Sequence, residues 1–157
     1  VEFLDMIRQN GFTPAVASIR SWEEPADEKT AAQLQLPEGT PMLRVSRLCT
    51  ADGRPAIYCE DVIEKALIRE RYTEEDLEPP IFHFLQQSCG IYPYLDLTDL
   101  RAVPADEKLA VVLQVPVGTP LLYMEEVDFD IDGKPVFCSA EYFADGIFRH
   151  TVLRKKL

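Results

Sequence analysis

The sequence lacks the short motifs by which most enzyme classes are recognised. It contains no Gly-x-Gly-x-x-Gly, P-loop, Gly-x-Ser-x-Gly, His-Glu-x-x-His or Ca²⁺-binding loop, so cofactor, phosphoryl-transfer and hydrolase interpretations have no support. Asp and Glu are abundant, but no spacing among them singles out a general acid and base pair. We therefore expect a protein that is not an enzyme, with no catalytic residues, no cofactor and no metal site.

Long apolar runs and an excess of positive charge are also missing. No run of eighteen apolar residues occurs, which argues against a membrane-spanning helix, and the first residues lack the basic and apolar regions of a secretory signal. Against 16 Lys and Arg stand 27 Asp and Glu, for a net charge of −11, and such a surface repels phosphate backbones and anionic lipids. We expect a cytoplasmic protein that contacts neither membranes nor nucleic acid through this segment.

Cysteine is scarce as well. The four cysteines, Cys49, Cys59, Cys89 and Cys138, show no Cys-x-x-Cys spacing and no neighbouring histidine, which argues against a zinc site. In a cytosolic protein such residues stay reduced and pack as small apolar side chains. We expect free, half-buried cysteines.

What the sequence does contain is a duplicated unit, at about residues 24–63 and 103–143. The Pro-Ala-Asp-Glu-Lys sequence of residues 25–29 returns at 104–108, residues 36–41 return at 115–120, and the Asp-Gly-x-Pro sequence of residues 52–55 returns at 132–135. The offset is 79 residues for the first two blocks and 80 for the third. One extra residue therefore enters the second unit, as a bulge or as a longer turn.

Each copy predicts a short helix followed by a hairpin of two long strands. Asp27 and Asp106 are typical N-cap residues of the two helices, and the Asp-Gly dipeptides at 52–53 and 132–133 supply the positive φ angles of tight hairpin turns. Strands are expected over residues 13–22, 42–50, 55–63, 92–102, 121–130, 134–143 and 148–153, and further helices over residues 2–10, 65–72 and 81–88. This order predicts an α+β fold, with an antiparallel sheet of about six strands and helices covering one face.

A charged residue interrupts the apolar face of the first long strand of the duplicated unit. Alternation places Arg47 on the same face as Leu43 and Val45. A charge left buried and unpaired would cost several kcal/mol, roughly. Arg47 therefore lies past the edge of the core, pairs with a carboxylate of the same sheet, or meets a ligand. Glu60 and Asp61, at the end of the return strand, are carboxylates that answer an arginine or face water.

By the second hairpin, the order of these signals resembles the UTRA domain, the ligand-sensing half of GntR-type bacterial transcription regulators of the HutC subfamily. The residues that carry the resemblance are Gly11-Phe12-Thr13-Pro14, Arg47, Asp52-Gly53-Arg54-Pro55, Gly90, residues 113–120, Asp132-Gly133-Lys134-Pro135, Ser139-Ala140-Glu141-Tyr142, Asp145 and Phe148. The resemblance covers essentially the whole chain, residues 1–157, as one ligand-sensing domain. The resemblance rests on the order and the duplication of the elements, because each element taken alone indicates only a turn.

This resemblance implies a chorismate-lyase-like fold that has lost the enzyme's reaction and binds a small effector. Family members carry a winged helix-turn-helix before this domain, and effector binding reorients the two DNA-binding domains of a homodimer. No such domain is present in these 157 residues. We therefore expect the isolated sensor of a larger repressor or activator, which contacts DNA only through the missing N-terminal domain.

Carried over one residue at a time, the resemblance also assigns ligand-binding residues. Arg47 falls where the family places an arginine that meets the anionic part of the effector, Tyr142 matches the tyrosine after the second hairpin, and Ser139 lies in the same segment. A family glutamate that contacts sugar hydroxyls is replaced here by Cys59, with Glu60 beside it. The ligand-binding candidates are Arg47, Cys59, Glu60, Tyr94, Ser139 and Tyr142.

Two departures from the family pattern bear on the effector. Members that bind phosphorylated amino sugars have a second arginine where this chain has Cys49, and a serine at the start of the middle helix where this chain has Pro79-Pro80. Free N–H groups at that helix end hold the phosphate. The resemblance therefore implies a smaller or more apolar effector with one anionic group. Two alternatives stay open: a lyase acting on a small aromatic or enol-ether acid, and an interaction module that pairs through exposed strand edges.

Overall fold

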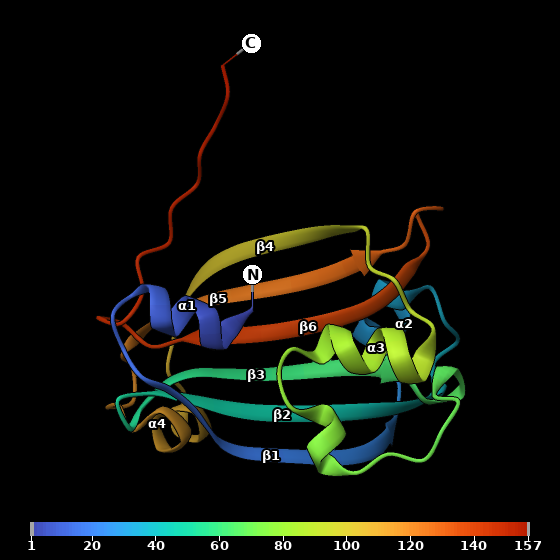
Figure 1. Cartoon of the computed structure of the whole chain (residues 1–157), viewed down its shortest axis with the longest axis horizontal. Coiled ribbons are helices and arrows are strands. Elements are labelled where there is room, and N and C mark those ends of the chain that lie inside the picture. Colours follow the sequence, from blue (N-terminus) through green and yellow to red (C-terminus); the bar gives the residue numbers. More distant parts are fainter. Residues whose placement is uncertain (1, 157) are drawn as a thin grey trace.

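The chain folds into a six-stranded sheet flanked by helices (Figure 1). A computed structural model describes residues 2–156, so residues 1 and 157 of the expected domain lie outside the described residues. In chain order the elements are α1 (Phe3–Gln9), β1 (Pro14–Pro25), α2 (Glu28–Leu34), β2 (Pro41–Ala51), β3 (Arg54–Glu64), the 3₁₀ turns η1 (Lys65–Leu67) and η2 (Glu74–Leu77), α3 (Ile81–Cys89), β4 (Leu95–Pro104), α4 (Glu107–Leu113), β5 (Pro120–Phe129) and β6 (Pro135–Phe143).

All neighbouring strands of the sheet run antiparallel, in the order β1-β2-β3-β6-β5-β4. One copy of the duplicated unit supplies α2, β2 and β3, the other supplies α4, β5 and β6, and the two copies join where β3 pairs with β6. The strands β1 and β4 are left as the two edges. The expected α+β fold, with an antiparallel sheet of about six strands, is confirmed.

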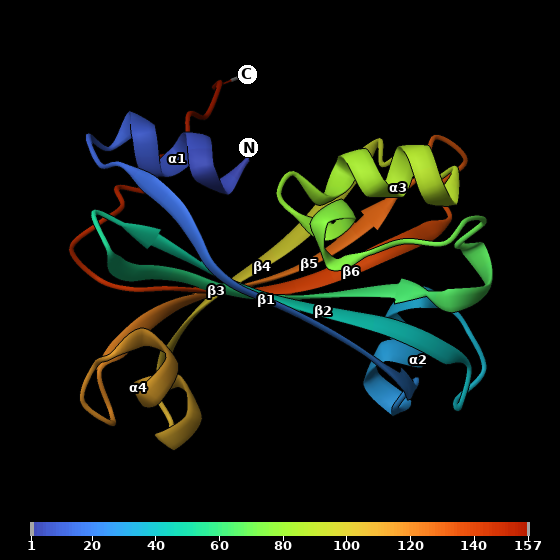
Figure 2. The ribbon, with the colours of Figure 1, turned by 60° about the horizontal axis from the view of Figure 1, so that its bottom comes forward.

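Helices cover both faces of the sheet, so the expectation that they cover one face is wrong. Figure 2 shows α1 and α3 on one face and α2 and α4 on the other. Leu43 of β2 packs in the cluster beneath α3, whereas the adjacent Met42 packs in the cluster beneath α2. Both residues are at most 1% exposed. Two-sided cover is the reason that the central strands are buried along almost their whole length.

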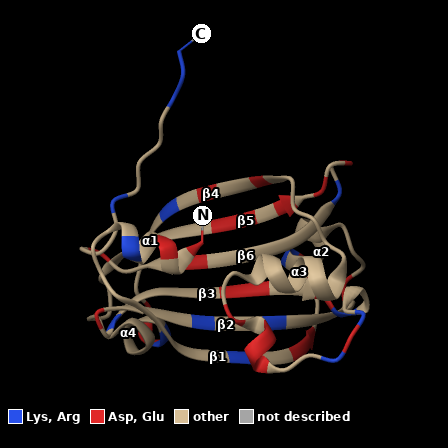
Figure 3. Ribbon diagram, in the orientation of Figure 1, with Lys and Arg blue, Asp and Glu red and all other residues tan. Residues whose placement is uncertain are grey.

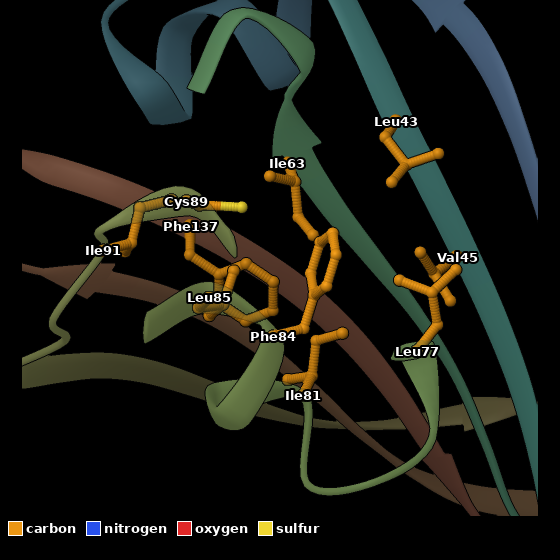
Figure 4. Close-up of a cluster of buried hydrophobic side chains, with 10 residues drawn as sticks. All are labelled: Leu43, Val45, Ile63, Leu77, Ile81, Phe84, Leu85, Cys89, Ile91 and Phe137. Carbon is orange, nitrogen blue, oxygen red and sulfur yellow. The ribbon is translucent and has the colours of Figure 1, made fainter. Parts of the chain in front are cut away.

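The apolar cluster beneath α3 holds that helix against β2, β3 and β6 (Figure 4). Leu77 and Leu85 are fully buried and Phe84 is 3% exposed. The cluster consists of Leu43, Val45, Ile63, Leu77, Ile81, Phe84, Leu85, Cys89, Ile91 and Phe137. Burial of one such side chain stabilises the folded state by ~1.5–3 kcal/mol. The cluster therefore fixes where the first turn of α3 lies over the sheet.

The helix N-caps repeat between the two copies, whereas the hairpin turns differ. The carboxylates of Asp27 and Asp106 each accept a hydrogen bond from a backbone N–H three residues on, at 2.8 Å, as expected of N-caps. Asp52 and Gly53 have φ angles of 49° and 78°, which match a two-residue type I′ turn. The caps and the first turn are confirmed. In the second hairpin only Gly133 of the Asp-Gly pair has a positive φ angle, 77°, so that turn is not of the predicted two-residue type.

The extra residue of the second copy lies in the hairpin turn. The register break at the start of the return strand occurs in both hairpins, after the Thr50–Pro55 pair and at the equivalent Phe129–Pro135 pair. Beyond it, Asp130 and Lys134 bracket a three-residue loop, with the Asp130 N–H donating to the Lys134 carbonyl at 2.9 Å. The extra residue therefore makes a longer turn and adds no further bulge.

Three other expectations need correction. Residues 148–153 form no strand, because the C-terminal segment runs away from the sheet and finds no strand to pair with (Figure 1). The helix expected over residues 65–72 is reduced to the single turn η1. The four cysteines are free, as expected, but fully buried instead of half-buried, because helices cover both faces. None of the helices described between residues 2 and 156 is long and apolar enough to span a membrane.

Candidate functional site

Helices α1 and α3 lie on the same face of the sheet (Figure 2). A cavity lies on this face, between the first residues of the two helices. It holds about 100 Å³ of space that water-sized molecules can occupy, and it opens to solvent at its mouth. Its walls are apolar and consist of Phe3, Pro80, Ile81, Phe82 and Phe137. Its floor carries charged side chains from five strands, namely Arg47 of β2, Asp61 of β3, Asp96 of β4, Glu126 and Asp128 of β5, and Glu141 of β6. We call it the α1/α3 cavity.

Arg47 lies at the bottom of this cavity and is already paired inside the protein. It is 1% exposed. Its guanidinium forms an ion pair with Asp61 on the neighbouring strand, its Nε donates to the Leu77 carbonyl at 3.1 Å, and its Nη1 lies 3.6 Å from the Cys59 sulfur. Burial alone would lower the pKa of Arg47, but the Asp61 carboxylate reverses this, so the pKa is raised. Of the alternatives open for Arg47, pairing with a carboxylate of the same sheet is the one observed.

The six predicted site residues do not gather in one place. Cys59 lies beneath Arg47 on the α1/α3 face, and Ser139 lines the cavity, where its Oγ donates to Glu141 at 2.9 Å. Glu60 lies on the opposite face, because successive side chains of a strand point to opposite sides of the sheet. There the Tyr58 hydroxyl donates to Glu60 at 2.7 Å.

Tyr142 and Tyr94 also lie apart from Arg47. Tyr142 packs on the opposite face between two tyrosine rings, with ring centres 4.9 Å from Tyr123 and 6.3 Å from Tyr58. Tyr94 precedes the edge strand β4 and is 63% exposed. The structure therefore brings together Arg47, Cys59 and Ser139, and separates the other three candidates from them.

A cluster of carboxyl groups was not predicted from the sequence. Figure 3 shows acidic residues on β3, β5 and β6 between α1 and α3. Asp61 and Glu126 lie on either side of Ser139 in the register of the sheet, and Asp96 lies opposite Asp128. The available sequence signal was the i, i+2 spacing of Glu126 with Asp128, which places both on one face of a strand. Which face that is depends on the fold.

Burial and mutual repulsion shift the acidity of this cluster. Burial, followed by the nearby charges of Glu126 and Asp96, raises the pKa of Asp128 to about 7. Burial and the charge of Glu126 raise the pKa of Glu141 to about 9. Asp128 Oδ2 is buried and has no hydrogen-bond partner among the described residues, and the Glu141 carboxyl lies within hydrogen-bond reach of the Glu126 carboxyl. A carboxylate in such a position is stabilised by a proton or by a cation.

A second hollow, with about 190 Å³ of space that water-sized molecules can occupy, lies on the opposite face beside α2. It is lined by Lys29, Arg44, Glu60, Glu125 and Tyr142, among others. Its carboxylates are paired: Lys29 lies 2.8 Å from Glu125, and Lys108 lies 3.1 Å from Glu60. We call it the α2 hollow. Glu60 and Glu125 of this hollow each have a basic partner, whereas Asp61 is the one carboxylate of the α1/α3 cavity that is paired with a basic side chain among the described residues.

The UTRA domain family matches residues 9–149 of the chain. An uncharacterized HTH-type transcriptional regulator of Rhizobium meliloti (strain 1021) is 27% identical over 124 residues, which are 76% of this chain and 49% of that protein. The chain thus spans about half the length of this curated relative.

Solved structures with the same architecture are also domains of transcription regulators. A GntR-family regulator from Enterococcus faecalis V583 superposes with a TM-score of 0.76 at 20% identity, covering 90% of this chain and 100% of that one. The effector domain of PhnF from Mycobacterium smegmatis superposes with a TM-score of 0.74 at 18% identity, covering 98% and 94%. A GntR-family regulator from Bacillus cereus gives 0.74 at 19%, covering 90% and 97%. These likenesses show the chorismate-lyase-like fold, and do not favour the lyase alternative.

Proposed function

The chain belongs to the UTRA domain family, and from this premise we propose that it is the effector-binding domain of a GntR-type transcription regulator of the HutC subfamily, acting in the cytoplasm. A small molecule bound in the α1/α3 cavity would control DNA binding by a winged helix-turn-helix in another part of the protein. The acidic surface of this segment, with a net charge of −11, fits a domain that does not itself touch DNA.

The observation that carries this proposal is the form of the α1/α3 cavity. Apolar walls surround a few polar groups that converge from separate strands, and one of them is the paired and fully buried Arg47. Such a combination gives a ligand both buried contact area and a defined orientation.

The position of α1 supports a route from the cavity to a preceding domain. Glu2 and Phe3 line the cavity at the start of α1, and a ligand that touches them would favour one placement of this helix over another. Phe3 also packs edge-to-face on Phe143 of β6, at 6.4 Å between ring centres. An effector that binds one arrangement better than the other shifts their populations, and a coupling of ~1–3 kcal/mol is typical of allosteric proteins.

We propose a homodimer that forms through the edge strand β4. Leu95, Leu97 and Leu100 of this strand are 63%, 61% and 54% exposed. Apolar residues on an unpaired strand edge favour association with another strand. Leu97→Lys would turn the dimer into a monomer in sedimentation analysis while leaving the circular dichroism spectrum unchanged. A monomeric wild-type chain would contradict the dimer.

The effector proposal is tested by a metabolite-panel thermal-shift screen on the 157-residue chain, followed by calorimetry. We expect at least one small metabolite to raise the melting temperature, and Ser139→Ala to weaken its binding up to about tenfold, the loss of roughly one hydrogen bond. Ser46→Ala is the matched control, because Ser46 is a buried serine on the opposite face. Equal effects of the two variants on affinity would place the ligand elsewhere.

A further inference from the structure

We propose that the effector of this domain carries a positive charge, an ammonium or guanidinium group that binds among Glu126, Asp128 and Glu141 in the α1/α3 cavity. The inference rests on the proposed function, since it names the chemistry of the molecule that this cavity would bind. It departs from the effector with one anionic group that the resemblance implies.

The charge balance of the cavity is the first support. Its lining holds six carboxyl groups, those of Glu2, Asp61, Asp96, Glu126, Asp128 and Glu141. Arg47 is the one Lys or Arg among the lining residues that the structure describes, and its guanidinium is paired with Asp61. The strands and α1 thus contribute acids, and α3 contributes Ile81 and Phe82, which do not titrate. An anionic ligand would add to this excess of negative charge, whereas a cation would offset it.

Two buried carboxyl groups without a basic partner are the second support. Asp128 and Glu141 are 4% and 3% exposed. Asp128 Oδ2 has no hydrogen-bond partner among the described residues, and the partners of the Glu141 carboxyl are Ser139 and the acidic Glu126, with which it can share a proton. A buried acceptor without a partner destabilises the folded state by ~1–3 kcal/mol, and more when it is charged. Folded proteins rarely retain such groups without a use. An N–H donor of a ligand ammonium or guanidinium would supply the missing partner.

Two other occupants fit the cavity less well. No group of three His, Cys, Asp or Glu side chains between residues 2 and 156 is arranged to hold a metal ion, which favours an organic cation. The N-terminus of α3 is a weak anion-attracting feature, worth roughly half a positive charge, but its cap residue is Pro80, which has no N–H to donate. The walls then select the rest of the ligand. Phe82 and Phe137, in edge-to-face contact at 6.4 Å, favour an apolar or aromatic body.

The experiment uses pairs of probes that share a body and differ in charge, such as phenethylamine with 3-phenylpropionate and butylguanidine with pentanoate. Binding to the 157-residue chain is followed by thermal shift and calorimetry at pH 6 and pH 8. We expect the cationic members to bind and the carboxylates not to bind. We also expect affinity for the cations to rise about two- to tenfold per pH unit, because binding expels a proton from the carboxyl cluster.

Matched variants locate the charge. Glu141→Gln and Asp128→Asn keep the shape of the side chains and should each weaken cation binding tenfold or more. Glu125→Gln, on the opposite face, should leave it unchanged. Binding of the carboxylates alone, or cation binding that ignores the two cavity variants, would overturn the cationic effector while leaving an effector domain intact. Failure of both charge classes and of the metabolite panel to bind would overturn the proposed function together with this inference.

Discussion

The two faces of the sheet treat negative charge in opposite ways. On the α2/α4 face, Glu125 accepts hydrogen bonds from Lys29 and Tyr123, and these lower its pKa although burial alone would raise it. On the α1/α3 face, burial and neighbouring carboxylates raise the pKa of Glu141 to about 9. One face neutralises its acids with its own lysines and the other does not. The α2/α4 face therefore balances its charges within the protein, whereas the acidic residues of the α1/α3 face would be stabilised by a cationic ligand.

The duplication explains which face is which. Lys29 and Lys108 occupy equivalent positions in α2 and α4, and each reaches a carboxylate on the sheet. The helices of the other face, α1 and α3, lie outside the repeated units and place no basic side chain in the cavity lining. The candidate site therefore combines a floor made by strands of both repeated units with walls supplied in part by helices that lie outside them.

Loss of Arg47 is the largest expected effect and separates the buried charge pair from an exposed one. Arg47→Met leaves Asp61 buried and unpaired, and should lower the free energy of unfolding by ~3–5 kcal/mol, as measured by urea denaturation. Arg44→Met, on the opposite face, removes a partner of Glu24 that is 43% exposed, and should cost far less. Adding Asp61→Leu to Arg47→Met should recover much of the loss. A small effect of Arg47→Met alone would mean that the buried Asp61 carboxyl group does not need the charge of Arg47 for the fold to be stable.

The next prediction concerns two Glu→Gln substitutions that should change the free energy of unfolding in opposite directions. The raised pKa of Glu141 means that the folded state holds its proton more tightly than the unfolded state, so stability falls as pH rises from about 4.5 towards 9. Glu141→Gln removes this loss and should stabilise the ligand-free chain at pH 8 by ~1–2 kcal/mol.

Glu125→Gln should act in the opposite direction. The pKa of Glu125 is lowered, so its contribution is present above the unfolded pKa and disappears as pH falls through the folded pKa. Its replacement should destabilise the chain at pH 8 by about 0.5–1 kcal/mol, with a smaller effect at pH 3. Denaturation curves at both pH values check this pair. Equal signs at pH 8 would remove the contrast between the faces.

The N-caps of α2 and α4 have the same geometry, and removing each one tests whether they contribute equally to the stability of the fold. Asp27→Ala and Asp106→Ala each delete an N-cap that accepts one N–H at 2.8 Å, and each should cost ~1 kcal/mol. Thermal unfolding should show nearly equal decreases in melting temperature. Asp52→Ala, in a turn with a positive φ angle, serves as a non-helical comparison.

The smallest expected effect is that of Tyr142→Phe. The Tyr142 ring packs between Tyr58 and Tyr123 away from the α1/α3 cavity, so removal of its hydroxyl should change stability by less than about 0.5 kcal/mol and leave the affinity of any cavity ligand unchanged. Calorimetry beside Ser139→Ala measures the contrast. Weaker binding in Tyr142→Phe would indicate that the effector binds in the α2 hollow instead.

Local features of the fold could be predicted from the sequence because they depend on neighbouring residues. Asp27 and Asp106 are followed by helices, and Asp52-Gly53 forms the turn that its φ preferences favour. Alternation along β2 placed Arg47 with Leu43 and Val45 on one buried face. This alternation did not decide whether Arg47 pairs with a carboxylate of the protein or with a ligand, since either partner would offset the cost of burying its charge.

By itself, the sequence determined the duplicated helix and hairpin units, the caps, the turns and the residues that share a face within each strand. Only the tertiary structure decided that helices cover both faces, and that Asp61, Glu126 and Glu141 meet over one cavity while Glu60 and Tyr142 lie on the other side. The physical reason is that the register between strands, and the face to which each helix returns, arise from contacts between residues far apart in the chain. The local periodicity of the sequence does not predict those contacts.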